Sequence, residues 1–166
     1  GRRAHPPKSE KIWYKKINER ERKKALRSAI SATIMDDIVK ERGHLTPHNY
    51  PFVLDEKFEL IRKTKEFFEV LKNLGLENEL SRIKKRKVRA GRGKSRGRKY
   101  KKRKGPLIVV SKMSEVSKSI SNIVGLEVVD VKSLNAELLA PGAKAGRLTL
   151  WTNLAIDMMK RENLFK

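Results

Sequence analysis

Apolar residues follow two kinds of spacing along this chain of 166 residues. Four segments are short apolar runs, a pattern that favours strands buried within a sheet. They are PFVLDE at 51–56, PLIVVS at 106–111, LEVVDV at 126–131 and GRLTLW at 146–151. In other segments the apolar residues recur every three or four positions, which predicts helices. These segments cover residues 19–34, 55–74, 77–87, 114–125 and 152–164.

Polar residues and glycine mark where several of these helices begin and end. Asn18, with Glu21 three positions later, has the spacing of a capping box before the first helix. Asp55 and Thr152 are the expected N-caps of the second and the last helix, and Gly75 offers the second one a C-terminal stop. The second helix is predicted to bury one apolar face. That face consists of Phe58, Ile61, Phe68, Leu71 and Leu74.

Strands alternate with helices of ten or more residues, which indicates a parallel sheet covered on both faces. The sequence therefore predicts an α/β fold, with a three-layer body, a mostly parallel sheet and helices on both faces, plus extended basic segments. Residues 18–166 form one predicted globular domain. Residues 1–17, which contain two prolines and no sustained period, are predicted to be an extended arm. The turn-rich segments 41–50 and 134–146 are interpreted as loops.

The formal net charge of +22 is concentrated in two blocks. Residues 1–27 hold eleven Lys or Arg and three acids, and residues 84–104 hold fourteen Lys or Arg and no acid. The rest of the chain contains sixteen bases and sixteen acids, and these acids are interpreted as partners for bases on helix surfaces. A neutral body that carries two cationic segments is typical of a protein that binds a polyanion.

Nucleic acid, an anionic membrane surface and an acidic protein are the usual partners of such a chain. No membrane partner is predicted, because the apolar runs are far shorter than the roughly 20 residues of a membrane span. The cations of segment 84–104 repel one another, and its three glycines make the backbone flexible. We therefore predict that this segment is mobile in the free protein and becomes ordered when it binds phosphate groups. Tyr100, its one aromatic residue, is equally suited to stacking on a base and to packing at the start of the next strand.

The predicted RNA-binding residues are cations of the two blocks, together with His5 and Tyr100. In the first block they are Arg2, Arg3, His5, Lys8, Lys11, Lys15, Lys16 and Arg20. In the second block they are Lys84, Lys85, Arg86, Lys87, Arg89, Arg92, Lys94, Arg96, Arg98, Lys99, Tyr100, Lys101, Lys102, Arg103 and Lys104.

Motifs for catalysis, nucleotide binding and metal binding are incomplete. The segment around Gly93 resembles a P-loop and a dinucleotide fingerprint, but Val88 and Arg96 stand where those motifs require glycine. Pro47 separates His44 from His48 and no third ligand is placed beside them, so hydrogen bonding within the loop is predicted for them. The chain has no Cys and no nucleophile motif. We therefore predict no enzyme activity, no catalytic residue, no cofactor, no metal and no small-molecule substrate.

Five segments carry a resemblance to a known family. They are GRRAHPPK at 1–8, ALRSAISATI at 25–34, ERGH at 41–44, RKVRAGRGKSRGRKYKKRKGPLIVV at 86–110 and SLNAELLAPGAKAGRLTLWT at 133–152. Together they resemble the fourth protein of the large ribosomal subunit in its archaeal and eukaryotic form. The segments occur in the order of that family and span nearly the whole chain.

The resemblance implies a structural protein of the large ribosomal subunit, located in the cytoplasm, whose partners are large-subunit (23S-type) ribosomal RNA and neighbouring ribosomal proteins. Members of the family begin with a strand, a helix and a long loop that contributes to the peptide exit tunnel. This sequence lacks that part, so residues 1–17 would be the returning root of the loop. The absence of a long basic tail favours the archaeal type. Two alternatives stay open, an α/β RNA-modifying enzyme and a regulatory protein that binds messenger RNA.

Overall fold

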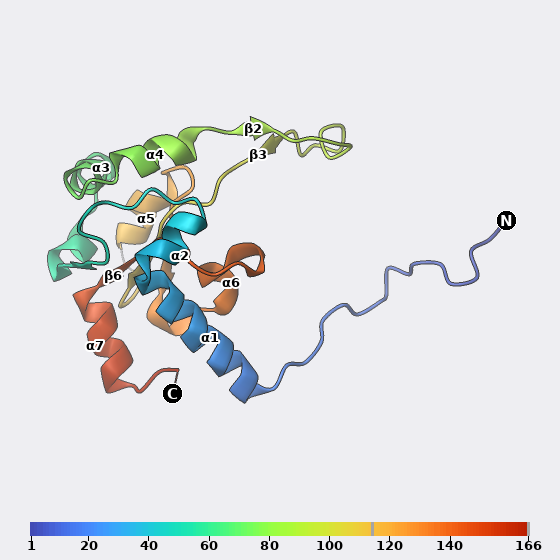
Figure 1. The fold of residues 1–166 in the computed structure, drawn as a ribbon, viewed down its shortest axis with the longest axis horizontal. Helices are drawn as coiled ribbons and strands as arrows, with labels where there is room; N and C mark the ends of the chain where they lie inside the picture. The colour runs from blue at the N-terminus through green and yellow to red at the C-terminus, as the bar shows by residue number, and fades with distance from the viewer. Residues whose placement is uncertain (114, 166) are drawn as a thin grey trace.

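Four parallel strands form the centre of the computed structural model, which describes residues 1–113 and 115–165 (Figure 1). They are β1 (Val53–Leu54), β4 (Leu107–Val110), β5 (Glu127–Asp130) and β6 (Thr149–Thr152). Their order across the sheet is β1-β6-β4-β5, and every pair of neighbours is parallel. The prediction of a mostly parallel sheet is therefore confirmed.

Helices cover both faces of this sheet. On one face, Ile108 and Val110 of β4 pack against helices α3 (Thr64–Asn73), α4 (Glu77–Lys84) and α5 (Glu115–Ser121). On the other face, Leu107 and Val109 pack against α1 (Glu19–Ile34), α6 (Ala136–Leu139) and α7 (Asn153–Arg161). Because successive side chains of a strand point to opposite faces, β4 divides its apolar residues equally between two cores. The predicted three-layer α/β body is confirmed.

Local sequence signals located several helix ends correctly. Helix α1 has the predicted bounds, and the Asn18 side chain accepts a hydrogen bond from the Arg20 N–H. Thr152 caps α7, and Gly75 follows α3 with a φ of 78°, in the left-handed region that favours glycine. Helix α5 begins at Glu115, and the Ser114 with which its prediction started lies outside the described residues.

The prediction of one helix over 55–74 is wrong. Asp55 caps a 3-10 helix, η1 (Glu56–Leu60), after which the backbone is extended until α3 begins at Thr64. Glu59 on η1 accepts hydrogen bonds from Ser111 and Thr152 at the ends of β4 and β6, and these contacts hold η1 against the sheet. Because of this break, α3 turns a different face toward the core than one continuous helix would. Phe67 is therefore fully buried, whereas Phe68 was the expected core residue.

Three other predictions need correction. The helix predicted over 77–87 ends at Lys84, because the chain becomes extended at Lys85. The segment 134–146, interpreted as a loop, contains α6 and a short 3-10 helix, η3 (Pro141–Ala143). The turn-rich segment 41–50 follows a helix that was not predicted, α2 (Asp36–Glu41). Glu59 and Glu79 are buried, so the acids of the body are not all surface partners.

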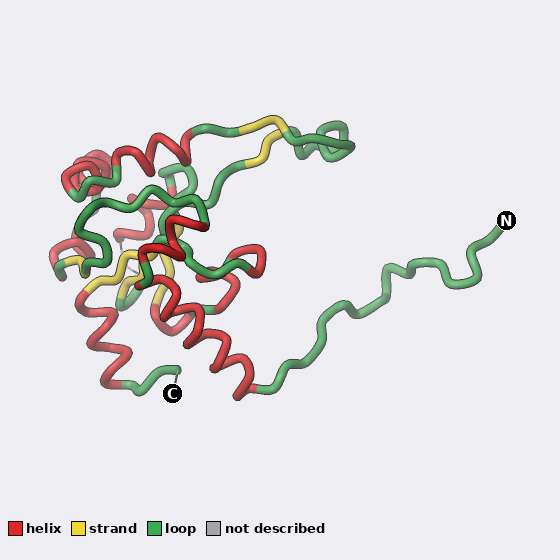
Figure 2. Tube along the Cα trace, viewed as in Figure 1, coloured by secondary structure: helices red, strands yellow, loops and turns green. Residues whose placement is uncertain are grey.

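Two basic segments extend from the body (Figures 1 and 2). The arm precedes α1, and every residue from 1 to 25 is exposed. Beyond α4 the chain forms a two-stranded antiparallel ribbon of β2 (Lys87–Val88) and β3 (Tyr100–Lys101), which the sequence did not predict. Among the described helices, none is long and apolar enough to cross a bilayer.

Candidate nucleic-acid interface

The ribbon presents most of its cations to solvent. Val88 lies opposite Tyr100, and the Arg86 guanidinium lies 4.2 Å from the centroid of the Tyr100 ring. Beyond this pair, the Arg89 N–H donates to the Lys99 carbonyl at 2.7 Å and the Arg98 N–H donates to the Gly93 carbonyl at 2.9 Å. The ribbon is thus held by backbone hydrogen bonds, by the stacked Arg86 guanidinium and by Arg89 Nε, which donates to the Arg98 carbonyl at 3.1 Å. Most of its other Lys and Arg side chains are exposed and can reach a ligand.

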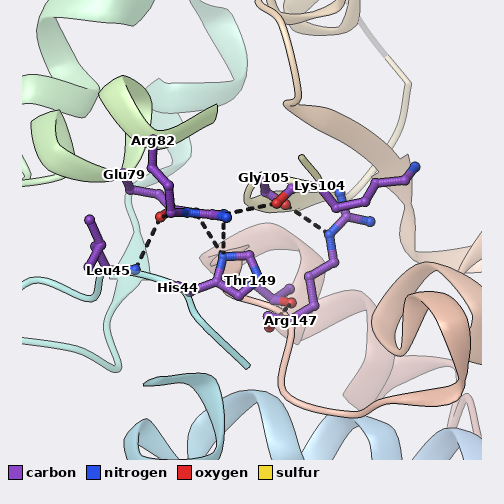
Figure 3. A network of polar contacts seen from close by, with 8 residues as sticks. All are labelled: His44, Leu45, Glu79, Arg82, Lys104, Gly105, Arg147 and Thr149. Atoms are coloured by element: carbon purple, nitrogen blue, oxygen red, sulfur yellow. Dashed lines mark hydrogen bonds and ion pairs between the residues drawn. The ribbon is translucent and has the colours of Figure 1, made fainter. Parts of the chain in front are cut away.

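Two arginines of the body hold the root of the ribbon where β3 leads into β4 (Figure 3). Arg82 on α4 donates from Nη2 to the Lys104 carbonyl at 2.9 Å, and Arg147 donates from Nε to the Gly105 carbonyl at 2.9 Å. The Gly105 N–H donates to the Gly125 carbonyl at 2.9 Å, and a Cβ at Gly105 would lie 2.6 Å from that same oxygen. This close approach requires glycine at position 105.

Glu79 orients Arg82 from inside the body. Both Arg82 Nε and Arg82 Nη2 donate to its carboxylate at 2.6 Å, and the Leu45 N–H donates to it at 3.1 Å. His44 Nδ1 lies 2.7 Å from the same carboxylate, and because a carboxylate only accepts hydrogen bonds, Nδ1 carries the hydrogen. Burial raises the pKa of Glu79, but the hydrogen bonds from Arg82, His44 and Leu45 outweigh it and bring the pKa down to about 2.

Arg147 lies between the ribbon root and helix α6. Its side chain is fully buried, and its Nη1 donates to Glu127 at 2.8 Å and to the Leu138 carbonyl at 2.9 Å. Lys104 forms a second ion pair with Glu127. Within the described residues, Arg147 Nη2 is buried and has no hydrogen-bond partner. Arg147 therefore brings an incompletely paired positive charge into this part of the body.

A cavity of about 770 Å³ lies where the ribbon root meets the body. Its lining consists of nine Lys and Arg side chains with His44, Pro141 and Gly142. The nine cations are Arg42, Arg82, Lys85, Arg86, Lys87, Lys101, Lys102, Arg103 and Lys104. No acid is among these lining residues. Such a cavity attracts an anion, and Arg and Lys side chains are the groups with which proteins contact phosphate oxygens.

Comparison with known proteins places the chain in a family. A family model described as "Ribosomal protein L4/L1 family" matches residues 1–162. The chain belongs to this family. Proteins named "Large ribosomal subunit protein uL4" from archaea are similar to it, in agreement with the archaeal type that the sequence favours. The relative from Nanoarchaeum equitans is 51% identical over 166 residues, which cover 99% of this chain and 62% of the relative.

Two further relatives of the L4 family show the same extent of similarity. The protein from Methanococcoides burtonii is 52% identical over 161 residues, covering 96% of this chain and 64% of the relative. The protein from Methanocaldococcus jannaschii is 46% identical over 162 residues, covering 96% of this chain and 64% of the relative. The chain thus spans a little less than two thirds of the length of these relatives.

The structure of this L4-family chain brings together only some of the predicted RNA-binding residues. Seven of them line the cavity: Lys85, Arg86, Lys87, Lys101, Lys102, Arg103 and Lys104. Those from Arg89 to Lys99 lie further along the ribbon, and those of the arm from Arg2 to Arg20 lie before or at the start of α1. In the part of the chain that the structure describes, Lys104 alone among the predicted cations is ion-paired with a carboxylate.

Four residues of the interface were missed as binding residues because they lie in the body. Arg42 and Arg82 line the cavity, and Arg147 holds the ribbon root. His44 was expected to form hydrogen bonds within its loop, but its ring contacts Glu79 on α4, and His44 also lines the cavity. A sequence signal existed for Arg147, since an arginine inside an otherwise apolar strand must be paired when it is buried. Arg42 and His44 belong to the ERGH segment that carries part of the family resemblance. Across the described residues, no group of three His, Asp or Glu is arranged to hold a metal ion.

Proposed function

We propose that this chain is a structural constituent of the large ribosomal subunit, which binds and clamps large-subunit ribosomal RNA and performs no chemistry. The observation that carries the proposal is the cavity at the ribbon root, where cations of the body and of the ribbon converge without an acid in the lining. Membership of the L4/L1 family and the names of the uL4 relatives support the ribosomal setting. In that setting the chain acts in the cytoplasm beside other large-subunit proteins.

The proposed mechanism divides the work between a rigid body and two basic segments. The body, with its two apolar cores, positions the ribbon through the bonds from Arg82 and Arg147 to the chain at residues 104–105. The cations of the ribbon and of the arm then contact phosphates of different RNA segments. Contacts to phosphate fix position and carry no sequence information, and folded RNA is recognised largely by its shape and backbone. Selectivity therefore comes from the fixed spacing of the segments.

An α/β enzyme would bind its substrate at the carboxyl ends of the parallel strands. At these ends Glu59 accepts hydrogen bonds from the Ser111 N–H, the Ser111 hydroxyl and the Thr152 hydroxyl, at 2.9, 2.7 and 2.5 Å. A carboxylate of the chain itself thus accepts the hydrogen bonds that are offered at the ends of β4 and β6. Neither this arrangement nor the incomplete glycine motifs favour an enzyme, and no observation favours a regulatory protein of messenger RNA.

The proposal is tested by measuring the affinity of the full chain for a large-subunit rRNA transcript and for a small-subunit rRNA transcript of equal length, at equal salt. We expect the large-subunit transcript to bind more tightly by a factor of at least about ten, since the fixed spacing of the cationic segments suits only some RNA folds. Equal affinity for the two transcripts would refute a specific role in the large subunit, because charge alone would then explain the binding.

A further inference from the structure

Most cations of the cavity lack a counter-ion within the described chain. Arg82 is paired with Glu79, and Lys104 is paired with Glu127. The other seven cations of the lining form no ion pair with a carboxylate of the described residues: Arg42, Lys85, Arg86, Lys87, Lys101, Lys102 and Arg103. The two acids that pair with lining residues, Glu79 and Glu127, are thus already engaged by Arg82, Arg147 and Lys104. The cavity keeps a large excess of positive charge.

Arg42 is the cavity cation that the body controls most closely. It follows α2, is half-buried, and donates to the Pro141 carbonyl of the loop that also forms part of the cavity wall. Burial, and then the positive charge of Arg147, lowers the pKa of the Arg42 guanidinium. Arg147 in turn is fully buried, and its Nη2 has no acceptor within the described residues. Arg42, which lines the cavity, is therefore close enough to the buried Arg147 for their positive charges to repel, and an anion beside Arg42 would offset this repulsion.

The ribbon wall has a similar excess of positive charge. Lys87 of β2 lies directly opposite Lys101 of β3 in the antiparallel register. Like charges directly opposite each other destabilise a pair of strands. The paired part of the ribbon is short, with two residues in each strand. An anion between this ribbon and the body would relieve repulsion on both walls at once.

From these observations we infer that the cavity is a phosphate-binding site, with Arg42 as its anchor on the body and Arg103 among its ligands on the ribbon root. The phosphate is a backbone phosphate of folded RNA, and its binding fixes the ribbon against the body. This inference rests on the proposed function, and it adds one defined contact site to a general cationic surface. A volume of about 770 Å³ is within the roughly 300–1,000 Å³ of small-ligand sites, so it can accept a length of sugar-phosphate backbone.

The test compares single-charge variants of the full chain. Arg42→Gln and Arg103→Gln each remove one cavity cation, and Arg161→Gln removes one exposed cation at the end of α7, outside the two basic blocks, as a matched control. Binding of inorganic phosphate is measured by NMR titration, and binding of a large-subunit rRNA transcript is measured by filter binding. We expect each cavity variant to weaken both by at least about tenfold, because hydrogen bonds to charged groups are the strong ones. We expect Arg161→Gln to leave the binding of phosphate and of RNA close to that of the parent.

One further measurement, the thermal midpoint, and one further variant, Arg42→Lys, separate binding from folding. Arg103 is exposed, so Arg103→Gln should keep the thermal midpoint of the parent even if Arg42→Gln, which loses its bond to Pro141, does not. Arg42→Lys keeps the charge but loses the planar fork, so its affinity for phosphate should lie between those of the parent and Arg42→Gln.

The inference is overturned if Arg42→Gln and Arg103→Gln match Arg161→Gln in both assays. It is also overturned if the cavity variants lose phosphate binding but keep the affinity of the parent for RNA, because the site would then take a free oxyanion instead of a backbone phosphate. A failure of the proposed function gives a different result, because the parent chain itself would then bind the large-subunit and small-subunit transcripts with equal affinity.

Discussion

Replacing Glu79 by Gln tests whether the network beneath the ribbon holds the body and the ribbon root together. Gln keeps the size of the side chain but removes the negatively charged carboxylate. That carboxylate accepts hydrogen bonds from Arg82, His44 and the Leu45 N–H. Glu79 is fully buried, and the Arg82 side chain is largely buried beside it. The substitution therefore leaves a cation without its partner inside the body. Removing one partner of a buried ion pair typically costs about 3–5 kcal/mol, a large part of a total stability of about 5–15 kcal/mol.

The dependence on pH gives an independent estimate of the same contribution. The folded-state pKa of Glu79 is about 2, below the ordinary glutamic acid value of 4.5. A carboxyl whose pKa is lowered by folding stabilises the protein above its unfolded-state pKa, and this stabilisation is lost as the pH falls toward the folded-state pKa. The difference of roughly two to three pKa units corresponds to about 3 kcal/mol. This stabilisation is fully present above about pH 4.5 and is lost between about pH 4.5 and pH 2.

Urea unfolding of the parent, Glu79→Gln and Glu66→Gln at pH 7 and at about pH 3 measures this contribution. Glu66 is half-exposed and pairs with Lys63 at 3.2 Å, so its variant should differ from the parent by no more than about 0.5 kcal/mol. The gap between the parent and Glu79→Gln should be about 3 kcal/mol or more at pH 7 and should narrow at pH 3. A gap below about 1 kcal/mol at pH 7, or a gap that does not change with pH, would refute the reasoning.

Three further predictions concern RNA binding and the loop after α6. If the chain neutralises six to ten phosphates, raising the salt from about 50 to 200 mM should weaken RNA binding by about a thousandfold or more, and a flat response in filter binding would count against the basic segments. Replacing five exposed ribbon cations by Gln should leave the thermal midpoint of the free protein unchanged and sharply reduce its affinity for RNA. Loss of the fold in this variant would show instead that the ribbon supports the core. The five cations are Arg92, Lys94, Arg96, Arg98 and Lys99. Gly146→Ala should destabilise by at least about 2 kcal/mol in urea, because φ is 87° and the new Cβ would lie 2.7 Å from the Ile38 carbonyl oxygen. Gly142→Ala, with φ at 74° but open space around its Cβ, should cost less, and equal costs would contradict this explanation.

The sequence predicted those parts of the fold that depend on local patterns. Asn18 and the apolar spacing after it are sufficient to define α1, and Leu148 and Leu150 are buried in the central sheet as their strand pattern indicates. The charge run at 84–104 was correctly expected to stay outside the core. Each of these features depends on residues only a few positions apart, which is the range that periodicity and capping rules describe.

The missed features depend on contacts between distant parts of the chain. Glu79 meets His44 across 35 positions, and Arg42 meets Pro141 across 99 positions, so no local pattern reveals either pair. The same holds for Glu59, whose bonds to the ends of two strands interrupt a helix that its own segment favours. The candidate site therefore combines a predictable half, the basic ribbon, with a half that only the folded body assembles.

Sedimentation of the native protein with ribosomal subunits tests the central claim most directly. Cell extract is separated on a sucrose gradient at a salt concentration that removes loosely bound basic proteins, and the protein is detected in each fraction. A structural constituent that is clamped onto large-subunit rRNA at several separate phosphate contacts should remain with the large subunit. Recovery at the top of the gradient, or with small subunits or messenger RNA, would contradict the account.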